Sequence, residues 1–129
     1  MFTIDRKIIK TITAPSAIGP YSQAIKYGNL IFVSGQIAIN PSTNEFVNGN
    51  IDSQTKQVIE NIKAILESAG SSLQKVLKVT IFITDMKDFD SINAVYSEYF
   101  GSSLPARACV EVSNLPKGAK VEMEAIASC

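Results

Sequence analysis

The sequence predicts an α+β fold: a single mixed β-sheet with two helices on one face, in the order β-β-β-α-β-α-β-β. Two segments place apolar residues at the three-and-four spacing of a helix, and each ends at a glycine. The other apolar segments are short, rich in β-forming residues and bounded by turn residues. A chain of 129 residues with neither a repeat nor a linker has the size of one domain. We therefore expect residues 1–129 to form a single domain.

Three strands are expected in the first third of the chain. Residues 3–12 alternate weakly and predict an edge strand. Residues 14–20 contain two prolines and a glycine, which predict a loop. Residues 21–26 and 30–35 are predicted to form a hairpin around a Tyr-Gly-Asn turn.

Two amphipathic helices are expected in the middle of the chain. After a turn at residues 40–44, Asp52 is a good N-cap for the first helix, and Gly70 lies at its expected C-terminal cap. Asp88 and Gly101 bound the second helix in the same way. The predicted apolar stripes consist of Val58, Ile59, Ile62, Ile65, Leu66 and Ala69 in the first helix, and of Phe89, Ile92, Val95, Tyr96, Tyr99 and Phe100 in the second.

Three more strands are expected around and after the second helix. Residues 74–84 form the first of them, and residues 107–113 and 121–127 form the last two, joined by a connection at 115–118. Both helices are expected to pack on the same face of the sheet. The opposite face must then be either polar or buried in an oligomer.

Arg107 lies where a core strand would usually carry valine, and it is one of two arginines beside ten lysines. A desolvated guanidinium is costly unless an anion or a carbonyl pairs with it. Alternation places Cys109 on the same side as Arg107, and we expect that side to point away from the helices. Glu122 and Glu124 share one side of the last strand. If the last two strands pair, the guanidinium, the thiol and the carboxylates meet.

The residue chemistry alone leaves two interpretations of Arg107 open: a ligand for a carboxylate, and a structural salt bridge to Glu122 or Glu124. A lone strand cysteine such as Cys109 is more typical of a small buried hydrophobe than of a nucleophile. Glu122 would act chemically only in a dry site that raises its pKa, and carboxylates in strands are more often solvated or structural.

Other polar residues are weaker candidates for a binding site. Asn93 interrupts the apolar side of the second helix, where a hydrogen bond to a neighbouring loop is a more common role than a ligand contact. Tyr21 follows a rigid Ile-Gly-Pro segment and is equally consistent with a plain turn. Ser34 and Gly35 end a strand, where glycine either allows a close ligand or marks an ordinary bulge.

The composition argues against several classes of function. Twelve basic and twelve acidic residues give zero net charge, which is unfavourable for nucleic acid or an anionic membrane as a partner. The absence of histidine removes Ser-His and Cys-His nucleophile pairs and the usual zinc ligand. There is no transmembrane-length apolar run and no signal-peptide pattern, and two cysteines suit a reducing compartment. We expect a cytoplasmic rather than a mitochondrial protein.

Five segments, spread over nearly the whole chain, together resemble the RidA family, which is also called YjgF/YER057c or L-PSP. They are residues 17–24, 32–37, 58–62, 105–112 and 121–127. The resemblance implies a fold similar to the small trimeric chorismate mutases. It also implies a homotrimer whose sheets form an inner barrel, with the sites in clefts between subunits. The implied activity is hydrolysis of 2-imino acids and their enamine tautomers, which leak from pyridoxal-phosphate enzymes, to 2-keto acids and ammonia.

The resemblance also implies roles for individual residues. Arg107 would hold the substrate carboxylate, while Glu122 and the backbone carbonyl of Cys109 would position and activate water. The pocket would be completed by Tyr21, Ser34, Gly35 and Asn93. No metal and no organic cofactor is expected. The chain departs from the family at Ala108, where a small hydroxyl residue is usual; alternation points this side chain away from Arg107, so we expect little effect.

Two other functions remain open at the level of sequence. Some relatives carry the label of ribonuclease or translation inhibitor, although zero net charge and the missing histidine weigh against RNA cleavage here. The chain could also form a trimer that binds small carboxylates, or acts like a chaperone, without turnover.

Overall fold

Residues 5–129, which the computed structural model describes, form one six-stranded sheet, a two-stranded ribbon and two α-helices. The strands of the sheet are β1 (Arg6–Ile9), β2 (Ala24–Tyr27), β3 (Leu30–Gln36), β6 (Val76–Ile83), β7 (Ala106–Glu111) and β8 (Val121–Ser128). The ribbon consists of β4 (Ile39–Asn40) and β5 (Glu45–Phe46), and the helices are α1 (Ile51–Ser68) and α2 (Phe89–Phe100). Three short 3₁₀ helices are η1 (Leu73–Lys75), η2 (Met86–Asp88) and η3 (Pro116–Gly118).

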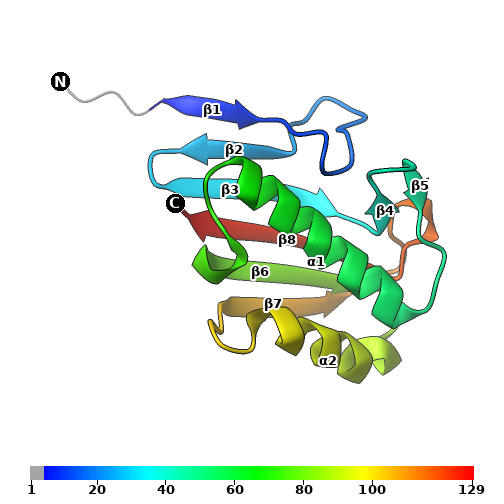
Figure 1. Cartoon of the computed structure of the whole chain (residues 1–129). Coiled ribbons are helices and arrows are strands. Elements are labelled where there is room, and N and C mark those ends of the chain that lie inside the picture. The colour runs from blue at the N-terminus through cyan, green and yellow to red at the C-terminus, as the bar shows by residue number, and fades with distance from the viewer. Residues whose placement is uncertain (1–4) are drawn as a thin grey trace.

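The strand order is β1-β2-β3-β8-β6-β7, as Figure 1 shows. Only β6 and β7 run parallel; the other neighbours are antiparallel, so the sheet is mixed as predicted. A parallel pair needs a crossover connection, and α2 provides it between β6 and β7. β8 is inserted between β3 and β6, which leaves β7 at the edge.

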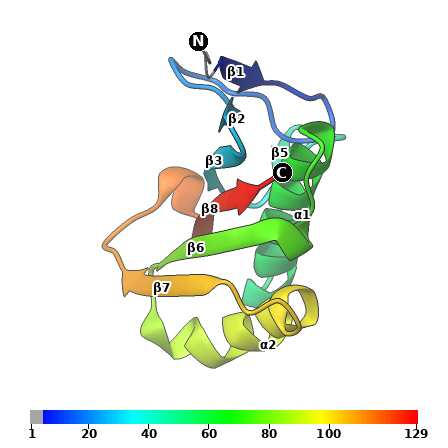
Figure 2. The same cartoon turned by 90° about the vertical axis from the view of Figure 1, so that its left-hand side faces the viewer.

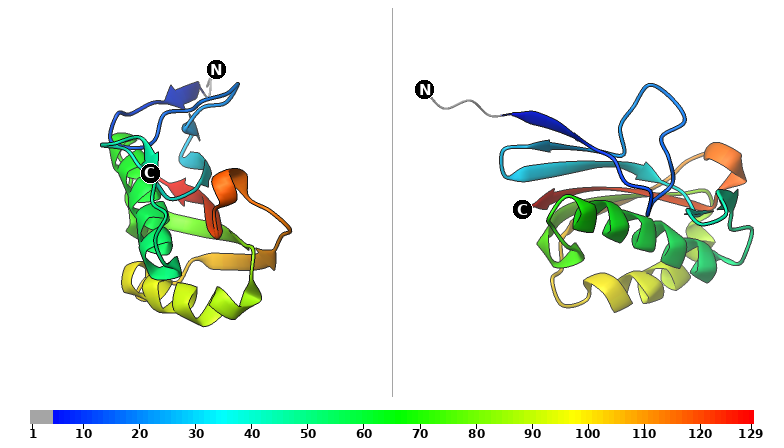
Figure 3. Two further views of the ribbon diagram at one scale, coloured as in Figure 1. Left: turned by 90° about the vertical axis from the view of Figure 1, so that its right-hand side faces the viewer. Right: turned by 45° about the horizontal axis from the view of Figure 1, so that its top comes forward.

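Both helices pack on one face of the sheet, as predicted, and the other face is uncovered (Figures 2 and 3). The core lies between the helices and the sheet. On the helix side it buries Val58, Ile59, Ile62, Ile65, Leu66, Ile92 and Phe100, and on the sheet side Ile31, Val33, Val79, Ile81, Ile83, Val121, Met123 and Ala127. Within the described residues, no helix is both long and apolar enough to cross a membrane.

The uncovered side of the sheet, which we call the open face, mixes apolar and acidic side chains. The strand register places Leu30, Phe32, Thr80, Phe82, Val110, Glu122, Glu124 and Ile126 on it. Phe32 and Val110 are 42% and 43% exposed in the isolated chain, so the face is not simply polar. This leaves an apolar surface of the kind that an oligomer would cover.

Several predicted boundaries shift in the structure. Asn50, not Asp52, is the N-cap of α1, because its side chain accepts a hydrogen bond from the Ser53 amide at 2.9 Å. Asp52 lies two residues further on, in the first turn of the helix, where a carboxylate is favourable near the positive helix end. Gly70 follows the C-cap Ala69 with φ +83°, the left-handed conformation that glycine adopts easily. Asp88 is the N-cap of α2, as expected, although its side chain makes no capping hydrogen bond.

The N-terminal strands are shorter than predicted. β1 covers residues 6–9 of the expected 3–12, and residues 3 and 4 lie outside the described residues. β2 begins at Ala24, so Tyr21 belongs to a turn in which its amide donates to the Gly19 carbonyl at 2.8 Å. The predicted turn at 40–44 is part of the β4–β5 ribbon.

Candidate active site

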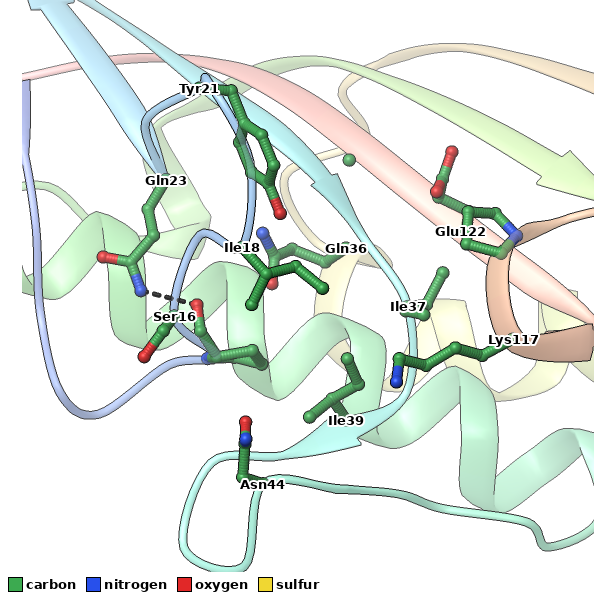
Figure 4. A pocket seen from close by; sticks show the side chains of 13 residues that line it. Ser16, Ile18, Tyr21, Gln23, Gln36, Ile37, Ile39, Asn44, Lys117 and Glu122 are labelled. Atoms are coloured by element: carbon green, nitrogen blue, oxygen red, sulfur yellow. Dashed lines mark hydrogen bonds between the residues drawn. The ribbon is translucent and has the colours of Figure 1, made fainter.

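A pocket of about 270 Å³ opens where β3 leaves the sheet, beside the loop that precedes β2 (Figure 4). Three of the predicted site residues, Tyr21, Gly35 and Glu122, line it. The remaining lining residues are Pro15, Ser16, Ile18, Gln23, Gln36, Ile37, Ile39, Asn44, Pro116 and Lys117. The pocket thus combines an apolar wall with several polar side chains, as a site for a small polar ligand requires.

Glu122 brings a half-buried carboxyl group to this pocket from β8. A β-bulge interrupts the pairing of β3 with β8 between Val33 and Gln36, and Gly35 lies within it. A Cβ atom at Gly35 would lie 3.1 Å from the carboxyl carbon of Glu122, so glycine allows this close approach and a larger residue would displace the carboxyl group slightly. Burial, and to a smaller extent the Glu124 carboxylate, raise the pKa of Glu122. The carboxyl group can therefore exchange a proton closer to neutral pH than an exposed glutamate can.

Gln23 fixes the loop that carries Tyr21, and sequence reasoning did not identify it. Its buried carboxamide donates to the carbonyls of Ala14 at 3.3 Å and Pro15 at 2.7 Å, and accepts from the Thr11 amide at 2.7 Å. Because the loop contains two prolines and few backbone donors, this side chain supplies the missing hydrogen bonds. The Tyr21 ring is thereby held at the mouth of the pocket, 51% exposed.

Ser34 lies beside the pocket but is not part of its lining. Its hydroxyl donates to the Ser22 carbonyl at 2.5 Å, and its amide donates to the Gln23 carbonyl at 2.9 Å. Ser34 therefore ties the bulged end of β3 to the Tyr21 loop.

Arg107 forms a second cluster, at the edge of the sheet where β7 lies. Its Nη1 donates to the Asn93 side-chain oxygen at 2.7 Å, and its guanidinium lies over the Tyr96 ring, 4.9 Å from the centroid. The Phe89 ring is 5.7 Å away. Asn93 thus bonds to Arg107, whereas a hydrogen bond to a neighbouring loop was expected from the sequence. Three groups from α2 hold the guanidinium in one orientation while Arg107 itself remains exposed.

The predicted orientation of Arg107 is wrong. In the parallel pairing of β6 with β7, Arg107 is opposite Val79 and Cys109 is opposite Ile81, and both β6 residues are buried in the core. Arg107 and Cys109 therefore face the helices, while Ala108 points to the open face, away from Arg107 as expected. A polar side chain is tolerated on the helix side because β7 is an edge strand, where the guanidinium reaches solvent past α2.

The last two strands do not pair, because β6 lies between β7 and β8, so the condition for a meeting of these groups is not fulfilled. Glu122 pairs with Phe82 and projects from the open face, whereas Arg107 projects from the helix side. Within one chain, a salt bridge from Arg107 to Glu122 or Glu124 is therefore excluded. The structure divides the predicted site residues into two groups: Tyr21, Ser34, Gly35 and Glu122 in one, and Asn93, Arg107 and Cys109 in the other.

Cys109 is half-buried against the core and carries a free thiol. Burial raises the pKa of the thiol, and the nearby Arg107 charge offsets this only in part. A protonated thiol is a poor nucleophile, so the side chain itself offers no covalent chemistry at neutral pH. Among residues 5–129, no cluster of three or more His, Cys, Asp or Glu side chains could hold a metal ion.

Comparison with known proteins assigns the family. The profile described as Endoribonuclease L-PSP matches residues 11–129. A RutC family protein of Pyrococcus abyssi is 63% identical over 95% of this chain and 96% of its own length. The 2-iminobutanoate/2-iminopropanoate deaminase of Mus musculus is 46% identical over 98% of this chain and 94% of its own length.

Solved structures agree with this assignment. A putative endoribonuclease from Thermotoga maritima, 53% identical, superimposes with a TM-score of 0.94 over 95% of this chain and 97% of that one. TdcF of E. coli with bound serine, 45% identical, superimposes with a TM-score of 0.91 over 95% of this chain and 98% of that one. The matches cover both clusters of polar residues described above. The chain therefore belongs to the RidA family, also known as YjgF/YER057c or L-PSP.

Proposed function

We propose that this protein hydrolyses 2-imino acids to 2-keto acids and ammonia. The observation that carries the proposal is the Glu122 carboxyl group, which lies against Gly35 at a pocket and has a raised pKa. Relatives named 2-iminobutanoate/2-iminopropanoate deaminase are 42–46% identical over nearly the whole chain. The pocket also suits a small ligand, and TdcF has been solved with bound serine, a small amino acid.

The reaction needs a group that holds the substrate carboxylate, and Arg107 is the best candidate. Its planar guanidinium can form two parallel hydrogen bonds with a carboxylate, and Asn93 and Tyr96 already orient it. Arg107 and Glu122 lie on opposite faces of the sheet in one chain, however. A site that uses both residues therefore requires Arg107 of one copy and the pocket of another.

A homotrimer satisfies this requirement. The open face exposes Phe32 and Val110, which packing against other copies would bury. In this assembly the edge strand β7 of one copy lies beside the pocket of its neighbour. The backbone carbonyl of Cys109 then reaches the pocket together with Arg107 and accepts a hydrogen bond from the attacking water.

The mechanism needs only positioning and proton transfer. Water held by Glu122 and the Cys109 carbonyl attacks C2 of the protonated imine, and Glu122 accepts a proton from it. The C2–N bond of the resulting aminoalcohol then breaks. The nitrogen takes up the proton from Glu122 and leaves as ammonia, and the C2 hydroxyl gives its own proton back to the Glu122 carboxylate as it becomes the keto group. Each such proton transfer contributes about 10²–10⁴-fold in rate.

The experiment is hydrolysis of 2-iminobutanoate, generated in place by an amino-acid oxidase with catalase present and trapped by semicarbazide. The protein should lower the amount of trapped imine and raise the keto acid, and it should be trimeric by light scattering. Purified protein that leaves the spontaneous rate unchanged would contradict the proposal. RNA cleavage that depends on Arg107 or Glu122 would favour a ribonuclease, and binding of keto acids without turnover would favour a carboxylate-binding trimer.

A further inference from the structure

The pocket contains polar groups that the proposed hydrolysis does not use. Lys117 and Asn44 line the side of the pocket away from the Glu122 carboxyl group, and the Gln36 carboxamide lies nearer the Tyr21 ring. Figure 4 shows the Lys117 amino group extending into the pocket beside Ile39, while Asn44 points in from the β4–β5 loop. These three side chains come from three separate segments of the chain.

Two of these residues have strained backbones. Lys117 has φ 58° and ψ 22°, and Asn44 has φ 60°, both in the left-handed region that side chains other than glycine rarely adopt. Within residues 5–129 only three non-glycine residues have positive φ, and two of them line this pocket. Asparagine tolerates this conformation, but lysine has no local interaction that favours it. Such strain persists where the surrounding structure imposes it, and it occurs preferentially at ligand sites.

The η3 segment imposes the conformation of Lys117. The Gly118 amide donates to the Leu115 carbonyl at 3.2 Å, and the Ala119 amide donates to the Pro116 carbonyl at 3.1 Å. Because both ends of the turn are fixed, the side chain of Lys117 is directed into the pocket and not along the loop.

Gln36 is a further polar residue of the lining. It is only 6% exposed, and its Nε2 donates to the Ser34 carbonyl at a long 3.3 Å. Among residues 5–129 no donor bonds to its carboxamide oxygen, which is not fully buried and so can accept a hydrogen bond from water or from a molecule in the pocket.

The Lys117 ammonium does not stabilise the charged form of Glu122, the other charged residue of the lining. Burial and Glu124 raise the pKa of Glu122, and the Lys117 ammonium does not counteract them. The ammonium is therefore free to pair with an anion.

We propose that Lys117, assisted by Asn44 and Gln36, forms a subsite for the side-chain carboxylate of an acidic 2-imino acid. This inference rests on the proposed function and specifies its substrate class. The α-carboxylate binds Arg107 of the neighbouring copy, C2 faces Glu122, and a second carboxylate one or two methylene groups further along reaches Lys117. The imines of aspartate and glutamate have this chemistry.

The experiment compares 2-iminoglutarate with 2-iminobutanoate for the wild-type protein, Lys117→Gln and the matched control Lys120→Gln, which removes a nearby exposed lysine outside the pocket. Lys117→Gln should lower kcat/KM for 2-iminoglutarate by about 10-fold, the lower end for a charge-assisted hydrogen bond. It should leave kcat/KM for 2-iminobutanoate within about twofold of the wild-type value. Lys117→Arg should restore kcat/KM for 2-iminoglutarate, because it keeps the positive charge. An unchanged ratio of the two substrates in Lys117→Gln would overturn the subsite.

Calorimetry with the keto-acid products separates this inference from the proposed function. Wild-type protein should bind 2-oxoglutarate more tightly than 2-oxobutanoate, and Lys117→Gln should lose that preference. Lys117-dependent binding without turnover of any imine would overturn the deaminase and keep the subsite. Turnover of 2-iminobutanoate with no Lys117-dependent preference for either dicarboxylate would keep the deaminase and overturn the subsite.

Discussion

The Arg107 cluster and the Glu122 pocket lie on opposite faces of the sheet and differ in how complete they are. Arg107 is held by a hydrogen bond from Nη1 to Asn93 and by the Tyr96 ring, so its orientation is fixed within one chain. The pocket has a Glu122 carboxyl group with a raised pKa, together with the polar side chains of Gln36 and Lys117. One region is thus preorganised within the chain, whereas the proposed function requires the other to be completed by a ligand and a second copy.

The largest expected effect comes from Arg107→Lys. Lysine keeps the charge but cannot form the paired hydrogen bonds of a guanidinium, so kcat/KM for imine hydrolysis should fall by about 100-fold. Because Arg107 is exposed, the melting temperature should change little. The control is Arg6→Lys, the other arginine of the chain, on β1. Equal activity of the two variants would show that the Arg107 cluster is structural only.

Glu122→Gln tests the pocket side of the comparison. The amide cannot accept a proton, so kcat should fall by about 100-fold, while Glu124→Gln should retain activity. Because Glu124 raises the pKa of Glu122, the acidic limb of the pH–rate profile should move to lower pH in Glu124→Gln. Unshifted profiles together with an active Glu122→Gln would assign the proton transfer elsewhere.

The raised pKa of Glu122 also predicts how the stability of the protein changes with pH. The folded protein keeps the Glu122 proton to a higher pH than the unfolded chain, so stability falls as pH rises from the ordinary carboxyl range through the raised pKa. Glu122→Gln removes this loss. Its advantage over wild type in free energy of unfolding should therefore grow between acidic and neutral pH, which denaturant titrations at several pH values can measure.

Gly35→Ala tests the pocket by displacing the Glu122 carboxyl group without removing it. The new Cβ would lie 3.1 Å from the Glu122 carboxyl carbon, which must shift by a few tenths of an ångström. We expect a loss of about 10-fold in kcat/KM, since rates depend steeply on position. Gly70→Ala is the contrasting variant: φ +83° makes it cost about 1–2 kcal/mol of stability, with kcat unchanged. A loss of stability with unchanged activity in Gly35→Ala would show that Gly35 serves folding and not the site.

The smallest effect is expected for Tyr96→Phe. The Tyr96 hydroxyl is buried and, within residues 5–129, has no hydrogen-bond partner, so its loss should leave stability unchanged or raise it by up to about 1 kcal/mol. The ring that supports the guanidinium remains, so kcat/KM should stay within about twofold. A large loss of activity would assign the hydroxyl a contact with substrate or with a second copy.

Much of the local structure could be predicted from the sequence. The apolar stripe from Val58 to Leu66 identifies α1 because a helix brings such residues to one face, and Gly70 marks its end. Glu122 could be assigned to the open face because the residues on its other side are uniformly apolar. The cap at Asn50 was missed because Asp52 is an equally good cap by residue type. Gln23, Gln36 and Lys117 escaped prediction, since nothing local distinguishes them from ordinary polar residues.

The sequence by itself determined the two helices with their apolar faces, the main strands and the family. Only the tertiary structure decided that β8 is inserted between β3 and β6, and that Arg107 faces the helices. The physical reason is that alternation defines two faces of a strand but not its neighbours, and an edge strand tolerates polar residues on either face. Strand order depends on pairing between segments that are distant in the sequence, such as β6 and β7, which the crossover through α2 brings together. The register of these pairings places Arg107 and Glu122 on opposite faces of the sheet, so one chain cannot bring them together.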